Sequence, residues 1–224
     1  MSAHVEQQLQ AYYHFHSAIY DATRWSFLFG RSRILRDLTV VCPAPRRILE
    51  VGCGTGRNVS HLCELYPAAT VTGIDLSEDM LRVARKKLAP YGQRVSWVRR
   101  PYSAGVGGPK PFDLILFSYS LSMFNPGWQE AISAALTDLT DEGCVAVVDF
   151  HSSRLAWFRN WMGVNHVRME GHLLPFLQQN CVPRLERVSA AYGGIWQYFQ
   201  FVGGRRPTGA ASQPAATAGR GKVN

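Results

Sequence analysis

The sequence lacks the long apolar segments of membrane-spanning proteins and the leader of secreted ones. None of its apolar runs reaches about 18 residues, the length that predicts a spanning helix. The first six residues, MSAHVE, show no signal-peptide pattern. We therefore expect a cytoplasmic protein.

The sequence also lacks the spacings that mark disulfide frameworks and metal sites. Its 5 cysteines form no C-x-x-C pair, and its 7 histidines are scattered without ligand spacing. An odd number of cysteines, mostly in apolar surroundings, indicates reduced core residues. We expect neither disulfides nor a bound metal.

Acidic residues are absent from the last part of the chain. The formal net charge is +8, and residues 204–224 supply +4 of it through Arg205, Arg206, Arg220 and Lys222. This segment is rich in Gly, Ala, Pro and Ser, so we expect a domain over residues 1–203 and a disordered basic tail over 204–224. The remaining charge suits an anionic membrane surface, nucleic acid, or a solvated surface with no partner.

The most informative segment runs from Glu50 to Asn58 with the letters EVGCGTGRN. A short apolar strand precedes it and a helical segment follows, so free N–H groups and a close-approaching backbone are expected here. Arg57 stands where a dinucleotide site needs its last glycine. A carboxylate at Glu50 suits an ammonium group better than a phosphate. The E-x-G-x-G-x-G pattern resembles motif I of the class I S-adenosylmethionine (SAM) methyltransferases, although many such turns only pack a helix on a strand.

An acidic residue ends the next expected strand, residues 70–75. Asp75 lies 23 positions after Gly52, close to the spacing of about 20 that is typical of a ribose-binding carboxylate. Ser77 is the better helix N-cap, which leaves Asp75 for the ligand. Leu76 and Met80 either flank the adenine or belong to the core.

The pattern of elements predicts an α/β fold. We expect strands over residues 47–51, 70–75, 95–99, 112–118 and 144–150, and helices over 59–66, 77–88 and 126–139. Residues 184–190 and 194–202 suggest a final antiparallel pair. Together these elements match the class I methyltransferase (Rossmann-like) architecture: a seven-stranded, mostly parallel sheet with a C-terminal antiparallel hairpin. Residues 1–35 are expected to add an N-terminal helical substrate cap.

This expected cap carries polar aromatic residues on one helical face. Tyr13, His16 and Tyr20 follow the spacing i, i+3, i+7. Their polar tips fit a substrate pocket, whereas packing of the aromatic rings into the core is the alternative.

Motifs of several methyltransferase classes are missing. The strand over 112–118 continues into YSLSM, where DNA and RNA amino-methyltransferases usually carry an N/D-P-P-Y motif. Because that motif is missing, we expect no nucleic-acid partner. The double-Glu loop of the protein arginine type and the metal-binding carboxylate cluster of the catechol type are not visible either. The oligomeric state cannot be read from the sequence.

Five segments occur in order: IYDATRW at 19–25, FGR at 29–31, the glycine-rich turn, SYSLSM at 118–123 and VVDF at 147–150. Many methyltransferases share the turn, whereas IYDATRW and SYSLSM are much more selective. Together the sequence resembles the bacterial N-methyltransferase of betaine-lipid synthesis over about residues 10–202. The resemblance implies that diacylglyceryl-homoserine is trimethylated with SAM at a membrane surface, which places the protein on the inner face of the cell membrane. Another amine as acceptor, such as phosphatidylethanolamine, an ornithine lipid or a small soluble amine, and a non-catalytic SAM-binding subunit stay open.

With this reaction in view, the candidate site residues fall into three sets. For catalysis, including proton removal, we consider Tyr20, His16, His151 and Tyr119. For the substrate we consider Tyr13, Arg24, Trp25 and Arg31, because aromatic faces hold a quaternary ammonium and guanidinium binds a carboxylate. For SAM we consider Glu50, Gly52, Cys53, Gly54, Gly56, Asn58, Asp75, Leu76, Met80, Tyr102 and Ser118.

Two segments leave their role open. Many class I enzymes hold the adenine amino group with an acid after the third strand, but this chain has RRPY at residues 99–102, so Tyr102 or a backbone group is expected there. Residues 155–167 combine two tryptophans with Arg159 and are bordered by Arg154 and Arg168, which fits either an interfacial helix or a core-packed lid with a basic rim.

Overall fold

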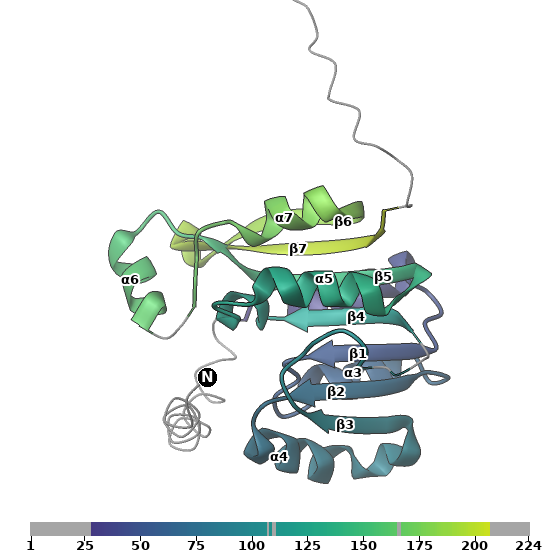
Figure 1. Ribbon diagram of the computed structural model, residues 1–224. Coiled ribbons are helices and arrows are strands. Elements are labelled where there is room, and N and C mark those ends of the chain that lie inside the picture. Colours follow the sequence, from purple (N-terminus) through teal and green to yellow (C-terminus); the bar gives the residue numbers. More distant parts are fainter. Residues whose placement is uncertain (1–27, 107, 109–110, 165–166, 207–224) are drawn as a thin grey trace, which may run out of the picture.

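A computed structural model describes residues 28–106, 108, 111–164 and 167–206. Seven strands form one sheet in the order β3-β2-β1-β4-β5-β7-β6 (Figure 1). Strands β1 to β5 pair in parallel, and β7 pairs antiparallel with both β5 and β6. The strands are β1 (Arg47–Val51), β2 (Thr70–Asp75), β3 (Val95–Arg99), β4 (Phe112–Ser118), β5 (Leu139–Ser152), β6 (Cys181–Ala191) and β7 (Trp196–Arg205).

Helices cover both faces of this sheet. One core cluster contains residues of α2 (Arg31–Val41), α3 (Arg57–Leu65) and α4 (Glu78–Leu88), and the other contains residues of α5 (Trp128–Asp138) and α7 (Leu173–Asn180). A further helix, α6 (Ala156–Val164), lies beyond the carboxyl ends of the parallel strands (Figure 1). Short 3-10 turns occupy Ala89–Arg94, Leu121–Met123 and Tyr192–Gly194.

The predicted fold class is confirmed. The first four strands begin and end where the sequence predicted. β1 and β4 are buried along nearly their whole length, because central strands of a parallel sheet are covered on both faces, whereas β3 at the edge is only partly buried. Strand β5 is longer than expected at both ends. The N-cap prediction is also confirmed, since the Ser77 hydroxyl accepts a hydrogen bond from the Met80 amide at 3.3 Å.

Two elements cross the boundaries that the sequence predicted for the cap and the tail. Helix α2 begins at Arg31 and buries Ile34 and Leu35 against the sheet, so residue 35 does not end a separate cap. Strand β7 runs to Arg205, two residues into the segment assigned to the tail. The Arg205 guanidinium holds this end by donating to the backbone oxygen of Leu136 at 2.9 Å. Helix α7 has no counterpart among the predicted elements.

Candidate functional site

The glycine-rich turn lies between β1 and α3, at the carboxyl edge of the sheet. Gly52, Gly54 and Gly56 have φ angles of 73°, 53° and 74°, a region that favours glycine. The amides of Gly52 and Cys53 both donate to the backbone oxygen of Ile74, at 2.9 and 3.1 Å. These bonds join the turn to the end of β2, so the two ligand-binding segments predicted from the sequence lie side by side.

The side chain of Glu50 is buried beneath this turn, with 1% of the residue exposed. Its Oε1 accepts a hydrogen bond from Asn58 Nδ2 at 2.6 Å, whereas Oε2 has no hydrogen-bond partner within the described chain. Burial raises the pKa of Glu50 to about 7, against the lowering effects of the Asn58 bond and the Arg31 charge. A buried acid with an open acceptor position fits a cationic ligand group, because buried charges are normally paired.

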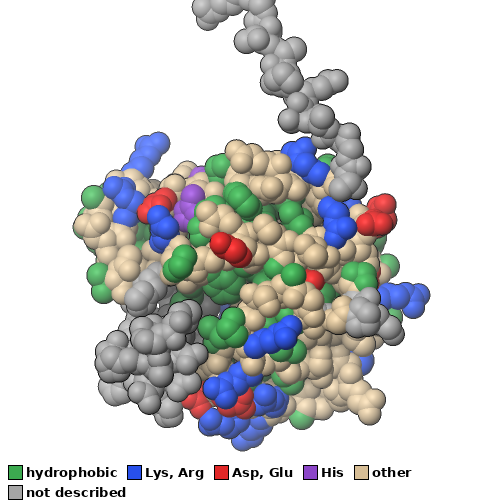
Figure 2. Space-filling view, in the orientation of Figure 1, with side chains coloured by type: hydrophobic (Ala, Val, Ile, Leu, Met, Phe, Trp, Pro, Cys, Tyr) green, Lys and Arg blue, Asp and Glu red, His purple; other side chains and the backbone are tan. Residues whose placement is uncertain are grey.

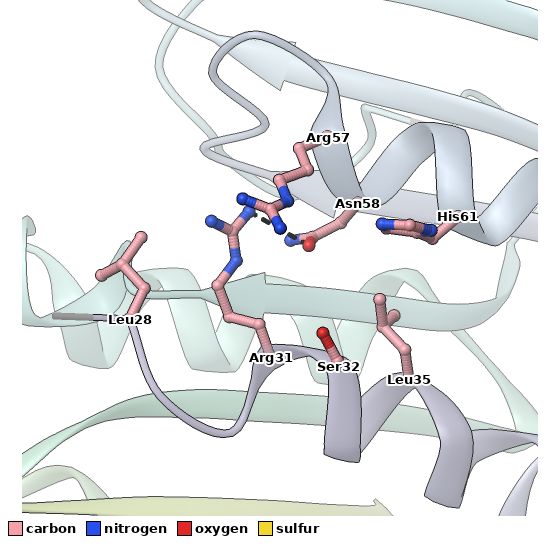
Figure 3. A pocket seen from close by; sticks show the side chains of 7 residues that line it. All are labelled: Leu28, Arg31, Ser32, Leu35, Arg57, Asn58 and His61. Carbon is pink, nitrogen blue, oxygen red and sulfur yellow. Dashed lines mark hydrogen bonds between the residues drawn. The ribbon is translucent and has the colours of Figure 1, made fainter. Parts of the chain in front are cut away.

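Asn58 also connects Glu50 to helix α2. Arg31, at the start of that helix, donates from Nη2 to Asn58 Oδ1 at 3.0 Å (Figure 3). The arrangement borders a cavity of about 280 Å³ between the starts of α2 and α3. Its lining residues are Leu28, Arg31, Ser32, Leu35, Arg57, Asn58 and His61. Arg57, which the sequence analysis treated only as a missing glycine, therefore adds a second guanidinium to this cavity.

Asp75 is less free than the sequence suggested. Its Oδ2 accepts from the Gly54 amide at 2.8 Å and its Oδ1 accepts from the Ser77 amide at 2.9 Å. Each carboxylate oxygen keeps a second acceptor position, so ribose hydroxyls remain compatible with this geometry. Leu76 beside it is 55% exposed, while Met80 is buried in α4.

The segment after β4 forms the opposite wall of the turn. A Cβ built at Gly52 would lie 2.7 Å from Ser120 Cβ, so this wall closes directly on the glycine. The hydroxyls of Ser118 and Ser120 are buried without a hydrogen-bond partner in the described part of the chain. Such groups point to an absent polar ligand or water. Ser118 was predicted from the sequence, and Ser120 was missed.

Tyr119 occupies a strained position between these serines, with a φ of 56°. It is buried, its hydroxyl donates to the Phe29 carbonyl at 2.7 Å, and its ring meets Phe150 edge-on at 4.7 Å. Burial raises the pKa of its hydroxyl well above the ordinary value. This hydroxyl is therefore neutral and already bonded, which favours a structural role over proton removal.

Asp149 holds the same segment from β5, and the sequence analysis assigned it no role. Its Oδ2 accepts from the Ser122 amide at 3.1 Å, and its Oδ1 accepts from the Phe150 amide at 2.8 Å. Burial raises its pKa to about 6, against these hydrogen bonds. Its sequence signal was its place in the VVDF segment, near the end of an apolar run.

His151 lies within β5 rather than after it. Its ring is 6.1 Å from that of Phe199, and its Nδ1 is buried without a hydrogen-bond partner among the described residues. Burial lowers the pKa of the imidazole, which favours the neutral form that can accept a proton.

Tyr102 is turned toward α5 instead of the site edge. Its hydroxyl donates to Asp138 Oδ2 at 3.2 Å, and its ring packs on Phe117. An adenine contact through this hydroxyl would require that bond to break. Tyr13, His16, Tyr20, Arg24 and Trp25 lie outside the described residues.

No helix of the described residues is both long and apolar enough to cross a membrane. No group of three or more His, Cys, Asp or Glu side chains among those residues is arranged to hold a metal ion.

Solved structures share this architecture. The 1,6-didemethyltoxoflavin-N1-methyltransferase of Burkholderia thailandensis, with bound 1,6-didemethyltoxoflavin and S-adenosylhomocysteine, aligns with a TM-score of 0.69 and 18% identity over 92% of both chains. The N-methyltransferase NodS of Bradyrhizobium japonicum WM9, in complex with S-adenosylhomocysteine, aligns with a TM-score of 0.63 and 20% identity, covering 79% of this chain and 85% of that one. At these identities the likeness establishes the fold.

Sequence comparisons agree with that fold. Residues 48–143 match the family model described as "Methyltransferase domain". Trans-aconitate 2-methyltransferase of Rhodopseudomonas palustris (strain BisB5) is 31% identical over 121 residues, which cover 52% of this chain and 44% of that protein. Malonyl-[acyl-carrier protein] O-methyltransferase of Legionella pneumophila is 40% identical over 91 residues, 38% of this chain and 29% of that one. The matched region thus spans less than half of either relative.

Proposed function

From the premise that this chain carries a class I SAM-dependent methyltransferase domain, we propose that it transfers methyl groups to an amine, the amino group of diacylglyceryl-homoserine. The product would be the betaine lipid diacylglyceryl-trimethylhomoserine. The alternative acceptor is another amine, namely phosphatidylethanolamine, an ornithine lipid or a small soluble amine.

The single observation that carries the donor site is the open carboxylate oxygen of Glu50 beside the glycine-rich turn. The amino-acid end of SAM bears an ammonium and a carboxylate. Glu50 suits the ammonium, and the Arg31 guanidinium suits the carboxylate. Asn58 bonds to both side chains and so fixes their separation. We therefore reassign Arg31 from the lipid substrate to the methyl donor.

The remaining donor contacts follow from the edge of the sheet. Asp75 would accept the ribose hydroxyls with its unused acceptor positions, and the exposed Leu76 would lie against the adenine. SAM supplies an activated methyl group, so the protein mainly has to position the amine and exclude water.

The amine must lose its proton before it can attack the methyl group. The neutral His151 imidazole, in β5 near its carboxyl end, is our candidate acceptor for that proton. The buried surroundings also favour a neutral amine over an ammonium ion. Tyr20 and His16 stay candidates for the same role from outside the described residues.

Support for an amino-lipid acceptor comes mainly from the IYDATRW and SYSLSM segments. Two structural neighbours carry the name N-methyltransferase, which agrees with a nitrogen acceptor. The names of the sequence relatives favour a different acceptor, since they refer to trans-aconitate and malonyl-[acyl-carrier protein].

The test is direct. The purified chain is incubated with SAM and, separately, with detergent-dispersed diacylglyceryl-homoserine, phosphatidylethanolamine or trans-aconitate, and products are measured by mass spectrometry. We expect a gain of three methyl groups on the homoserine lipid and none on trans-aconitate. Methylation of trans-aconitate alone would overturn the proposed acceptor. The control is a Glu50→Gln variant, in which products that do not depend on the methyl-donor site would persist.

A further inference from the structure

Helix α6 exposes apolar side chains on one face while it packs on the protein with another. Phe158 and Met162 are buried, and the Phe158 ring stacks on Trp196 at 5.1 Å. Trp157 and Val164 lie about two helical turns apart on the adjacent face and are 63% and 78% exposed. Trp161 falls between them on the same face and is 49% exposed. The helix is therefore anchored by one apolar stripe and presents a second.

The surroundings of this second stripe are basic. Residues 151–169 contain Arg154, Arg159 and Arg168 and no acid. All three arginines are exposed. Arg159 donates from Nη1 to the backbone oxygen of Ser153 at 2.6 Å, and Arg168 pairs with Glu170 at 2.7 Å. Figure 2 shows hydrophobic and basic side chains together at the end of the molecule that carries α6. Tryptophan amid arginine is the composition of helices that lie in the headgroup region of anionic membranes.

The position of α6 adds a third observation. The helix lies beyond the carboxyl ends of the parallel strands, the edge that also holds Glu50 and the glycine-rich turn (Figure 1). A surface bound through α6 would therefore face the same edge as the site. A water-soluble acceptor gives no reason for such an apolar stripe, because large exposed apolar patches usually mark an interaction surface.

We propose that the exposed stripe of α6, Trp157, Trp161 and Val164, together with Arg154 just ahead of the helix, docks the protein on an anionic lipid bilayer. The inference rests on the proposed function, because a diacyl substrate resides in such a bilayer. The apolar side chains enter the headgroup boundary, and the Arg154 guanidinium contacts lipid phosphate.

The test uses the full chain without SAM or amino-lipid, so it is independent of catalysis. Co-sedimentation is measured with vesicles of phosphatidylcholine alone and of phosphatidylcholine mixed with phosphatidylglycerol. The test variant is Trp157→Ser with Val164→Ser. The matched control is Val40→Ser with Val83→Ser, whose parent side chains on α2 and α4 are 81% and 52% exposed.

We expect wild type and control to bind the anionic vesicles, and the α6 variant to bind at least about tenfold more weakly. Binding should weaken with salt and be far lower on pure phosphatidylcholine. Equal binding by wild type and the α6 variant would overturn the proposal. A lack of vesicle binding by wild type would also overturn the proposal. If, in addition, the α6 variant unfolded at a lower temperature than the control, the protein's own chain would be covering the stripe.

Catalysis then separates the two proposals. If the α6 variant methylates detergent-dispersed diacylglyceryl-homoserine at the wild-type rate but loses activity on vesicles, both proposals stand. If wild type binds vesicles through α6 but methylates no amino-lipid, docking stands and the proposed acceptor is wrong.

Discussion

The side-chain amide of Asn58 donates to Oε1 of Glu50 over 2.6 Å and so determines which carboxylate oxygen remains for a ligand. Oε2 is the one left buried without a partner in the described chain. A cationic group of the methyl donor at this oxygen would satisfy both the acceptor and the buried charge. The predictions begin from this pair.

Replacing Glu50 with Gln should weaken binding of S-adenosylhomocysteine by about thirtyfold, because a charged hydrogen bond contributes roughly 2 kcal/mol. Isothermal titration calorimetry gives the affinity directly. Glu130→Gln, at an exposed position in the first turn of α5, is the control and should bind like wild type. Unchanged affinity in Glu50→Gln would remove this carboxylate from the donor site.

Stability of the ligand-free protein should fall as pH rises. The unfolded chain ionises Glu50 near its ordinary pKa of 4.5, whereas burial in the folded protein raises this pKa to about 7. Between these values the folded state binds more protons than the unfolded state, so stability decreases by about 3 kcal/mol across the window. Asp149 acts in the same direction between its ordinary pKa of 3.8 and a raised pKa of about 6.

Urea unfolding at about pH 5 and about pH 8 measures this loss. Glu50→Gln should be more stable than wild type at the higher pH and should keep only the smaller decrease caused by Asp149. A stability that rises over this range in wild type and variant alike would contradict the burial of these ionised carboxylates.

Donor binding should depend on pH in the opposite sense. An ammonium group beside Glu50 favours the carboxylate, so affinity for S-adenosylhomocysteine should rise as pH passes the Glu50 pKa of about 7. The Arg31 charge lowers this pKa, so Arg31→Gln should move the midpoint of the affinity profile to higher pH as well as weaken binding. Calorimetry over a pH series measures both effects.

Arg57→Gln is the matched control for that shift. Arg57 lines the same cavity, but its charge is not among the influences on the Glu50 pKa. The midpoint of the affinity profile of Arg57→Gln should therefore equal that of wild type. An equal displacement in both variants would mean that the general charge of the cavity, rather than the Arg31 charge in particular, lowers the pKa of Glu50.

Gly52→Ala should destabilise the protein through both strain and collision. The φ of 73° is unfavourable for alanine by about 1–2 kcal/mol, and the new Cβ would lie 2.7 Å from Ser120 Cβ. Gly193→Ala isolates the strain, since Gly193 has a φ of 66° and open space around its Cβ position. We expect Gly52→Ala to lose more stability in urea unfolding than Gly193→Ala, and Ser120→Gly to recover the difference. Equal losses would indicate that the wall after β4 moves freely.

The sequence predicted the sheet well because the relevant signals are local. Each of the first four strands is a short segment rich in apolar or β-branched residues, and the glycines of the turn stand at alternate positions. Helix α7 was missed because its eight residues, LLPFLQQN, contain a proline and too few turns to show a period. The tail boundary was missed because Gly204 and Arg205 resemble linker residues, although Arg205 is held by carbonyls at the end of α5.

The candidate site likewise contains residues that the sequence predicted and residues that it did not. Glu50, the three glycines and Asp75 could be identified because the turn and its acid follow a fixed spacing. Ser120 and Asp149 carried no such spacing, and their importance depends on what lies opposite them. Tyr102 stays a prediction: its position after β3 suggests the adenine, while its hydroxyl bonds to Asp138.

The sequence by itself determined the succession of strands, the helices α3, α4 and α5 between them, the glycine-rich turn and the acids near the ends of β1 and β2, because these depend on neighbouring residues. Only the tertiary structure decided how Glu50 is left half-satisfied: Arg31 reaches Asn58 across 27 positions, and Tyr119 reaches Phe29 across 90. No local pattern encodes such contacts, since they form when helices from distant parts of the chain pack on one sheet. That packing also removes water from Glu50, which raises its pKa.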